Sequence, residues 1–344
     1  MNTCHGRKTR DAAGVCIAVA DWYPSASRET LVRRAELRDA IRAYFRSQSV
    51  VEVDTPLVGR YSATDPAVTS FSVGERRADG FQPVGYLQTS PEFHMKRLLA
   101  AGTNSIFQIC KSFRQGESGA LHNPEFSILE WYRIGFDHHT LMDEVEELVA
   151  GILGLREFSR VSYSSLFEGF FKINPHQAST EDLKGLVTEN VAIDQSQLDF
   201  ASESVAHGFC LDLLMSEKLE PSLTKPTFVY DYPVSQAALS ASALSPQGDR
   251  IAQRFELYVQ RMEIANGYLE LRDADELRHR FKADNTSREL ENLPVVPPDE
   301  HLLSAMTHGL PECAGVALGI DRLLMLLTGA QLISDVLAFP GSTA

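Results

Sequence analysis

The chain has 344 residues, 44% of them hydrophobic and 23% charged, which is the balance of an ordinary globular protein. No apolar run approaches the roughly 18 residues of a membrane-spanning helix, and a formal net charge of −14 argues against a protein that wraps nucleic acid. The five cysteines are scattered and never at C-x-x-C spacing. This argues against a disulfide framework or a zinc site and predicts a reducing, cytoplasmic location.

The chain is expected to begin with an extension and a long helix. Residues 1–20 should be poorly ordered, because their apolar run AAGVCIAVA is too short for a secretory signal. Residues 28–49 have apolar side chains at helical spacing. Four arginines recur every four residues along this helix and form one stripe: Arg34, Arg38, Arg42 and Arg46. The stripe is either a solvated face, the simpler interpretation, or a contact surface for an acidic partner.

Short strands and two helices should follow. Residues 50–53 form a strand that ends before Pro56, because proline has no N–H for the ladder. Ser90 caps a helix with Pro91 at its first position, and Gly102 ends that helix. The other elements expected here are a looped hairpin at 60–85, strands at 106–110 and 126–131, and a core-facing helix at 138–153.

The second half predicts an insertion and then more sheet. Residues 155–225 are acidic and helix-prone and should form a helical insertion. Two antiparallel strands are expected within 254–270, turning at Ala265-Asn266-Gly267. The remaining elements are strands at 228–233 and 315–318, helices at 273–290 and 321–327, and a proline-rich connector at 291–300. Strands in antiparallel runs predict an α+β fold, with a central antiparallel sheet flanked by helices in one domain over 21–344.

The usual nucleotide-binding loops are absent from the sequence. Neither G-x-x-x-x-G-K-[ST] nor G-x-G-x-x-G after a strand occurs, and there is no G-x-S-x-G. Any nucleotide would have to be bound by arginines and acidic residues on the sheet. Arg114 and Arg322 can bind phosphates through their guanidinium groups. Phe126, with His122 and Asn123, can hold an adenine ring.

Acidic and polar residues complete the predicted site. Glu263 and Glu270, seven residues apart across the expected Asn-Gly turn, can bind Mg²⁺ together. A polar pocket for a small cationic substrate can be made by Glu92, Glu130, Tyr132, Asn266 and Tyr268. Singly, each of these residues is more commonly a surface ion pair or a packing residue. Their occurrence together and in order raises the functional interpretation, and the reaction that fits is activation of a carboxylate by ATP with loss of pyrophosphate.

Five segments taken together resemble class II aminoacyl-tRNA synthetases of the lysyl type. VVEVDTP resembles motif 1, FR…HNPEF…LEWY between Phe113 and Tyr132 resembles motif 2, and GVALGIDRLLML resembles motif 3. RMEIANGYLEL and TSPEFHMKRLLAAG are similar to the lysine pocket and its entrance. The similarity covers residues 22 to 340. It implies ATP as a substrate, Mg²⁺ as a cofactor and a homodimer formed through motif 1 at Pro56.

A subgroup of that family fits better than the tRNA enzyme. Motif 1 starts near residue 34, so we expect the preceding anticodon-binding domain to be missing. TKPTFVYDYPVSQAALS and GLPECAGVALG resemble ligases that attach lysine or (R)-β-lysine to elongation factor P, and Ala317 stands where the tRNA enzyme usually has glycine. The resemblance implies activation of (R)-β-lysine, or lysine, as the adenylate and its transfer to a lysine side chain of elongation factor P. It disfavours tRNA as the acceptor and implies no membrane partner.

By position, the resemblance assigns residues to two substrates. The amino acid is assigned Ser90, Pro91, Glu92, Glu130, Tyr132, Asn266, Tyr268, Glu270 and Ala317. ATP is assigned Arg114, Gln115, Gly116, His122, Asn123, Phe126, Glu263, Ile264, Gly319 and Arg322. The catalytic residues would be Arg114, Arg322, Glu263 and Glu270, with Glu263 and Glu270 as the Mg²⁺ ligands.

The chain departs from the family in the motif 2 loop. The family reads Phe-Arg-Asn-Glu, whereas this chain reads Phe113-Arg114-Gln115-Gly116, and Leu121 replaces the usual tyrosine. The missing glutamate predicts weaker ATP binding, unless Glu117 replaces it. Two other functions stay open: a lysine-type ligase for another acceptor, such as tRNA or a small amine, and a non-catalytic paralog that binds an amino acid and regulates a partner.

Overall fold

The computed structural model describes residues 8–10, 16–18, 22–78 and 80–344. Its central feature is a nine-stranded sheet in the order β3-β7-β8-β14-β13-β12-β10-β9, with β11 also paired to β12. The two pairs at the edges, β3–β7 and β9–β10, are parallel, and the pairs between them are antiparallel. The predicted α+β fold with a central antiparallel sheet flanked by helices is confirmed.

The strands are β1 (Lys8–Arg10), β2 (Cys16–Ala18), β3 (Val51–Glu52), β4 (Val58–Gly59), β5 (Ser72–Arg77), β6 (Gly80–Leu87), β7 (Ile106–Phe113), β8 (Glu125–Ile134), β9 (Ser159–Ser162), β10 (Thr227–Pro233), β11 (Ser242–Leu244), β12 (Arg250–Val259), β13 (Met262–Leu269) and β14 (Cys313–Gly319). The α-helices are α1 (Arg28–Ser47), α2 (Glu92–Ala100), α3 (His138–Leu153), α4 (Tyr163–Phe171), α5 (Thr180–Asn190), α6 (Glu203–Leu214), α7 (Ala274–Leu290), α8 (Glu300–Gly309) and α9 (Ile320–Thr328).

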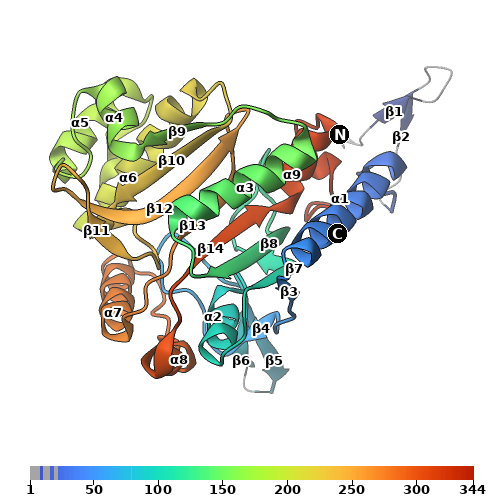
Figure 1. The fold of residues 1–344 in the computed structure, drawn as a ribbon, viewed down its shortest axis with the longest axis horizontal. Coiled ribbons are helices and arrows are strands. Elements are labelled where there is room, and N and C mark those ends of the chain that lie inside the picture. Colours follow the sequence, from blue (N-terminus) through green and yellow to red (C-terminus); the bar gives the residue numbers. More distant parts are fainter. Residues whose placement is uncertain (1–7, 11–15, 19–21, 79) are drawn as a thin grey trace.

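Three helices cover one face of the sheet and leave the other face free for a cleft. The helices α1, α3 and α9 pack against the sheet and one another, as Figure 1 shows. The core between them contains buried aromatic and aliphatic side chains, among them Phe45, Trp131, Leu148, Phe255 and Leu324. The helix predicted at 138–153 is α3, with the same bounds, because Asp137 caps its start and Gly154 ends it in the left-handed conformation.

The predicted insertion at 155–225 is mainly helical, but it also extends the sheet. Its helices α4, α5 and α6 form a second core that includes Tyr163, Phe167 and Leu211. It begins with β9, which pairs in parallel with β10 and was not predicted. The alternation in Ser159–Ser162 is too short to reveal a strand whose partner lies almost seventy residues further along the chain.

The turn predicted at Ala265-Asn266-Gly267 is wrong. The chain turns at Gln260 and Arg261, which both have positive φ, and Asn266 and Gly267 lie inside β13. Asn-Gly is the commonest signal for a two-residue hairpin turn. Here the glycine serves close packing, since a Cβ on Gly267 would come within 2.6 Å of Phe255 Cζ and 2.7 Å of Val316 Cβ.

The arginine stripe on α1 is partly used inside the chain. Arg34 forms an ion pair with the buried Asp321 at 2.6 Å, and its guanidinium also donates to the carbonyl oxygen of Val336. Arg42 forms an ion pair with Glu52 at 3.0 Å. Burial and the neighbouring Arg34 and Arg42 lower the pKa of Arg38. The stripe is therefore not a purely solvated face, and half of it anchors α1.

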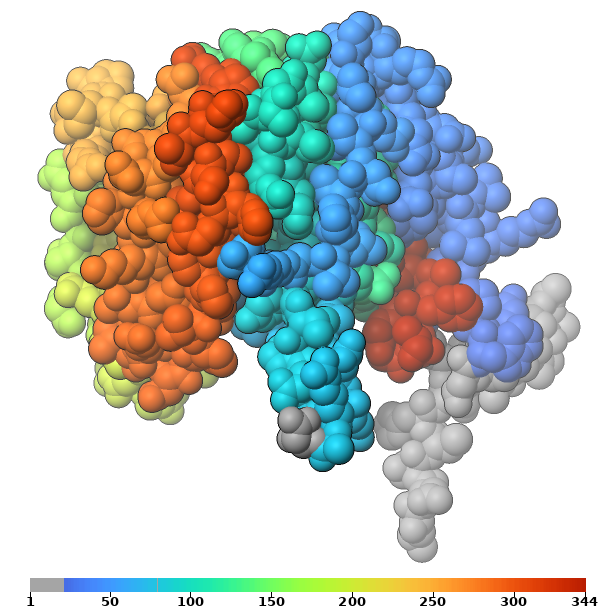
Figure 2. All heavy atoms as spheres, turned by 90° about the horizontal axis from the view of Figure 1, so that it is seen from below, coloured from blue at the N-terminus to red at the C-terminus, as the bar shows by residue number. Residues whose placement is uncertain are grey.

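Two small sheets lie apart from the central sheet. Within residues 1–20, predicted to be a poorly ordered extension, β1 and β2 pair antiparallel, and the remaining residues lie outside the described ones. The β5–β6 hairpin, with β4 at its base, stands out from the body in Figure 2. None of the helices in the described part of the chain is long and apolar enough to cross a membrane.

Candidate active site

The candidate site is a cleft of about 1330 Å³ on the sheet face that α1, α3 and α9 leave free. Strands β8, β13 and β14 form its floor, and α2, α6, α7 and the segment 58–68 form its walls. Nearly all of the predicted site residues line this cleft. The exceptions are Pro91, Gln115 and Gly116, which do not reach it.

One end of the cleft is a buried pocket with three carboxylates. Glu92 lies at the start of α2, Glu130 on β8 and Glu270 just after β13. Glu130 accepts hydrogen bonds from the hydroxyls of Ser90 at 2.8 Å and Tyr132 at 2.7 Å. Glu130 and Tyr132 lie together because they are two residues apart on β8 and therefore share one face of the strand.

A buried lysine that was not predicted as part of the site lies between two of these carboxylates. Lys96 Nζ is 2.6 Å from Glu92 Oε1 and 2.5 Å from Glu270 Oε2. Lys96 is 1% exposed, and its ammonium group also lies over the ring of Tyr268, whose hydroxyl donates to Glu92. Its spacing of four residues from Glu92 on α2 is the signal that could have revealed it.

Burial and charge set the protonation of this pocket. Burial, reinforced by the charge of Glu92, raises the pKa of Glu130 to about 7. Burial also raises the pKa of Glu270 to about 8, although Lys96 acts against it. Burial lowers the pKa of Lys96, but the carboxylates of Glu270 and Glu92 outweigh that effect and hold it above its usual value. Such a pocket favours a ligand that brings further ammonium groups.

The floor of the pocket is a glycine on β14. Gly315 lies opposite Tyr132 on β8, and Ala317, two residues on, lies opposite Glu130. A Cβ on Gly315 would be 2.3 Å from Glu270 Oε1 and 2.4 Å from Tyr132 Cε1, so no side chain fits there. Ala317, in contrast, places its methyl group in the cleft wall.

The other end of the cleft carries two arginines. The guanidinium of Arg114 lies over the ring of Phe126 at 5.2 Å, as expected if both bind one nucleotide. Arg322 donates to the carbonyl oxygen of Glu263 at 2.7 Å and pairs with the Glu263 carboxylate at 3.3 Å. Its other nitrogen lies 2.7 Å from His122 Nε2, and burial together with Arg322 lowers the pKa of His122.

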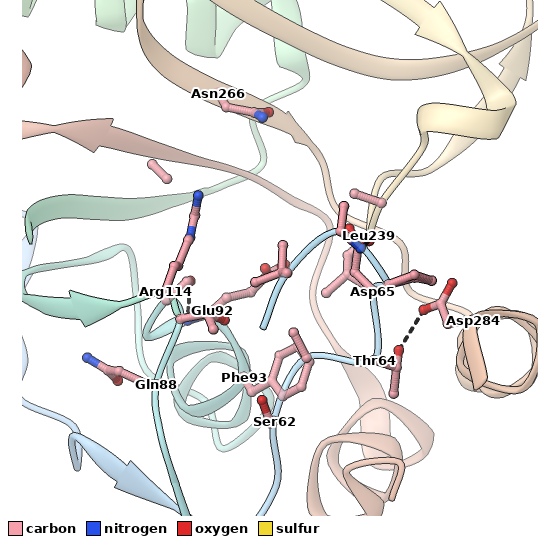
Figure 3. A pocket seen from close by; sticks show the side chains of 18 of the residues that line it. Ser62, Thr64, Asp65, Gln88, Glu92, Phe93, Arg114, Leu239, Asn266 and Asp284 are labelled. Atoms are coloured by element: carbon pink, nitrogen blue, oxygen red, sulfur yellow. Dashed lines mark hydrogen bonds between the residues drawn. The ribbon is translucent and has the colours of Figure 1, made fainter. Parts of the chain in front are cut away.

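Figure 3 shows the cleft between these two ends. Arg114 projects toward Asn266, and Glu92 lies beside it. The segment carrying Thr64 and Asp65 crosses the cleft, held to α7 by a hydrogen bond of 2.6 Å from Thr64 Oγ1 to Asp284 Oδ2. This segment lines the cleft together with α2 and α7.

Two residues of the predicted nucleotide site, Asn123 and Gly116, are constrained by the surrounding backbone. The side chain of Asn123 accepts from the backbone of Gly341 at 2.9 Å and donates to the carbonyl oxygen of Glu125 at 2.6 Å, so it holds the C-terminal segment. Gly116 has φ of +87°, where a glutamate would be strained. Glu117, the next residue, instead lies within 3.5 Å of Arg114, so a carboxylate is still present beside that arginine.

The proposed metal pair Glu263 and Glu270 is wrong in its geometry. Both residues belong to one extended segment, so seven residues separate them by roughly 23 Å. The carboxylate whose charge acts on Glu263 is that of Glu256 on β12, two residues before Tyr258, which lies opposite Glu263 across the real turn at residues 260–261. The spacing from Glu256 to Glu263 is also seven residues, so this alternative pair could have been considered from the sequence once the turn was placed.

Glu256 and Glu263 form an acidic centre beside the arginines. Glu256 accepts hydrogen bonds from the hydroxyls of Tyr232 and Tyr258 and pairs with Arg254. Burial and the charge of Glu256 raise the pKa of Glu263, while Arg322 lowers it. A smaller cavity of about 180 Å³ behind this centre contains Glu220, whose pKa burial and Glu263 raise to about 7. Such crowding of carboxylates favours a bound cation.

Comparison with known proteins agrees with this geometry. Residues 18–343 match the family model described as tRNA synthetases class II (D, K and N). A protein of Pseudoalteromonas translucida named elongation factor P–(R)-β-lysine ligase is 47% identical over 323 residues, covering 92% of this chain and 97% of that protein. Proteins of the same name from Pectobacterium carotovorum and Yersinia enterocolitica are 43% and 44% identical, and the matches cover 92% and 93% of this chain and 97% and 98% of those proteins. The chain therefore belongs to the class II tRNA synthetase family, and within it to the elongation factor P–(R)-β-lysine ligases.

Proposed function

We propose that this protein activates (R)-β-lysine, or lysine, with ATP and transfers it to a lysine side chain of elongation factor P. One observation carries the proposal: a single cleft joins two arginines suited to a triphosphate to a pocket of three buried carboxylates suited to ammonium groups. The relatives, named for ligation of (R)-β-lysine to elongation factor P, supply the identity of the amino acid and the acceptor.

The first step is the attack of the substrate carboxylate on ATP. A carboxylate oxygen bonds to the α-phosphorus, the bond to the bridging oxygen breaks, and pyrophosphate leaves with the electron pair. No base is needed, because the nucleophile is already ionised, and positioning and charge neutralisation carry the step. Arg114 would bind the α-phosphate. Arg322 would bind the γ-phosphate in place of its present contacts with His122 and Glu263.

Glu256 and Glu263 are the residues that would hold Mg²⁺. Carboxylate oxygens are the ligands that this ion prefers, and it shares them with phosphate oxygens. Relief of the repulsion between Glu256 and Glu263 would favour its binding. When bound, the ion supplies positive charge next to the phosphates. Glu270 is not a ligand in this proposal and belongs to the amino-acid pocket.

The second step transfers the activated amino acid. The neutral amine of an acceptor lysine attacks the carbonyl carbon, the bond from that carbon to the phosphate oxygen breaks, and AMP leaves. The new amide loses one proton, which passes to solvent. The segment carrying Thr64 and Asp65 lines the cleft, so an acceptor side chain that enters the cleft would pass close to it.

Gly315→Ala is expected to abolish binding of the amino acid. The added methyl group would displace Tyr132 and Glu270 from the pocket, since both lie under 2.5 Å from its position. We expect at least about a 100-fold loss of kcat/KM for the amino acid with the KM for ATP little changed, because overpacking costs about 1–3 kcal/mol and misplaces the ligands as well. Gly185→Ala on α5, where a Cβ meets nothing within 4 Å, is the matched control and should retain full activity. Full activity of Gly315→Ala would contradict the assignment of the pocket.

The KM for the amino acid is expected to rise as the pH falls from 8 to 6. Glu130 and Glu270 have pKa values near 7 and 8, so they take up protons over this range in the free enzyme. Protonated carboxyls bind an ammonium group less well, so affinity is full above the higher pKa and is lost below the lower one. Steady-state kinetics over this range would check this, and the KM for ATP should change less. A KM for the amino acid that is flat from pH 6 to 8 would count against an ammonium ligand at these carboxylates.

A homodimer is also part of the proposal. The segment that resembles motif 1 exposes Val51, Leu57 and Val58, which are 55%, 40% and 46% exposed. Adjacent apolar side chains at a surface mark a protein interface. Light scattering of Val58→Glu beside the unchanged protein would test this: loss of a dimer supports the interface, and a monomer in both contradicts it.

Intact-mass spectrometry of the acceptor tests the proposed function most fully. Purified elongation factor P, incubated with the enzyme, ATP and (R)-β-lysine, should gain the mass of one β-lysyl group on a lysine. A parallel reaction with tRNA as the acceptor should show no product. Transfer to tRNA alone would favour the synthetase alternative, and no product on either acceptor would remove the transfer step from the proposal.

A further inference from the structure

A cluster of two histidines and one aspartate lies away from the cleft, where the first turn of α3 meets β10. The register of β10 against β12 shifts between Tyr230 and Tyr232, so that Asp231 alone lies opposite two residues of β12, Gln253 and Arg254, at a β-bulge of that strand. Asp231 has φ of +58°, so its backbone is left-handed and its side chain is redirected toward α3. None of the three residues, His138, His139 and Asp231, lines the cleft.

The three side chains converge. His138 Nε2 is 3.3 Å from Asp231 Oδ1, and the rings of His138 and His139 are 4.1 Å apart. Each residue has one possible metal-binding atom, and these three atoms all lie within 4.8 Å of one another. No other group of three or more His, Cys, Asp or Glu residues is arranged in this way in the described part of the chain. His138 is buried, with its side chain 4% exposed, and its Nδ1 has no hydrogen-bond partner among the described residues. Among the described residues, the polar contact of this buried ring is therefore the one between Nε2 and Asp231.

We propose that His138, His139 and Asp231 form a binding site for a divalent transition-metal ion of the zinc class. Two imidazoles and one carboxylate are donors that zinc accepts, with bonds of about 2.0–2.2 Å. In a tetrahedron with such bonds the ligand atoms lie roughly 3.3–3.5 Å apart, which is the separation already found between His138 and Asp231. His139 is exposed, so the fourth position opens to solvent.

The charges around the cluster are compatible with a bound cation. Asp137, which caps α3, lies beside the cluster. Its negative charge offsets the positive end of the helix dipole, which would otherwise disfavour a cation here. Arg160 is the cation that faces the cluster, but its guanidinium is held by Asp143 at 2.6 Å and Glu146 at 2.9 Å.

The site would fix one end of the strand that supports the acidic centre. A bound ion would tie α3 to Asp231, and the next residue, Tyr232, donates its hydroxyl to Glu256 at 2.7 Å. The role inferred for the ion is therefore structural. It would hold β10 at Asp231, opposite the bulge of β12, and thereby the orientation of Tyr232.

Calorimetry with zinc tests this proposal on the full chain. The protein is stripped with a chelator and titrated with ZnCl₂ in buffer containing millimolar Mg²⁺, which occupies carboxylate-only sites. We expect one Zn²⁺ per chain and a rise in the melting temperature with added zinc. His139→Gln and Asp231→Asn should each weaken this binding by about 100-fold or more, since loss of an outer partner alone costs about 10- to 100-fold.

The matched control is His308→Gln, an exposed histidine on α8. It should bind zinc like the unchanged protein. His139 is exposed, so its replacement is not expected to unfold the chain, and circular dichroism of both variants would verify this. No stoichiometric binding, or binding that survives in both His139→Gln and Asp231→Asn, would overturn the proposal.

Discussion

Lys96→Met is expected to lower kcat/KM for the amino acid by about 100-fold or more, because breaking a buried ion pair costs about 3–5 kcal/mol. Lys96 lies within 2.6 Å of carboxylate oxygens of both Glu92 and Glu270 and has almost no exposure. Without it, two carboxylates are left in a buried pocket beside Glu130, and they take up protons rather than remain charged. The protonated pocket then binds an ammonium group poorly. Pyrophosphate exchange with a range of amino-acid concentrations measures the loss.

A double variant separates the loss of charge balance from the loss of fold. Lys96→Met should lower the free energy of unfolding, and Lys96→Met with Glu270→Gln should recover part of it, since the uncompensated carboxylate is gone. Activity should not recover, because the amino acid loses Glu270 as well. If Lys96→Met keeps kcat/KM within about twofold of the unchanged protein, the lysine contributes less than about 0.5 kcal/mol to transition-state binding. It would then have no part in organising the pocket.

Glu256→Gln and Glu263→Gln are each expected to lower kcat by about 100- to 1000-fold, the loss seen when a group that stabilises transition-state charge is removed. Both variants should also need a higher Mg²⁺ concentration to reach half of their remaining activity. The charge of Glu256 on β12 raises the pKa of Glu263 on β13, and Glu263 pairs with Arg322. Glu270→Gln should differ in kind: the KM for the amino acid rises, and the Mg²⁺ requirement stays unchanged. Exchange assays at several Mg²⁺ concentrations compare the three variants.

The conservative variant Glu263→Asp serves as the control for charge, since it keeps the carboxylate and should retain part of the activity. Glu256 also holds Tyr232 and Tyr258, so thermal unfolding of Glu256→Gln must be measured beside its kinetics. A shift of the Mg²⁺ requirement in Glu270→Gln, with none in Glu256→Gln, would restore the pair first predicted and refute the present one.

Local signals predicted most of the fold, and they failed where packing competes with them. The helix at 138–153 has both a cap and a terminating glycine, so its bounds were predictable. The Asn266-Gly267 pair carries the strongest hairpin signal, yet Gly267 is in a strand because Phe255 and Val316 leave no room for a side chain. No sequence rule distinguishes a glycine required for a turn from one required for close contact.

The error in the turn determined the error in the metal pair. With the turn at 265–267, Glu263 and Glu270 would lie opposite each other. With the turn at 260–261, Glu263 lies opposite Tyr258, and the carboxylate that acts on it is Glu256. Lys96 was missed for another reason: a lysine on an amphipathic helix is normally solvated, so its spacing from Glu92 was not recognised as a sign of burial, and its ion pairs with Glu92 and Glu270 appear only in the structure. The three carboxylates of the pocket were predicted from the resemblance, whereas its floor at Gly315 was not.

The most direct test of the central claim is pyrophosphate exchange with the purified protein, offered (R)-β-lysine, (S)-lysine and a panel of other amino acids. Absence of exchange with amino acids that lack a second amino group is the result expected from three carboxylates in the pocket. Exchange that is faster with (R)-β-lysine than with lysine is the result expected from the names of the relatives. Absence of exchange with every amino acid at saturating ATP and Mg²⁺ would contradict the account, and it would favour the non-catalytic paralog instead.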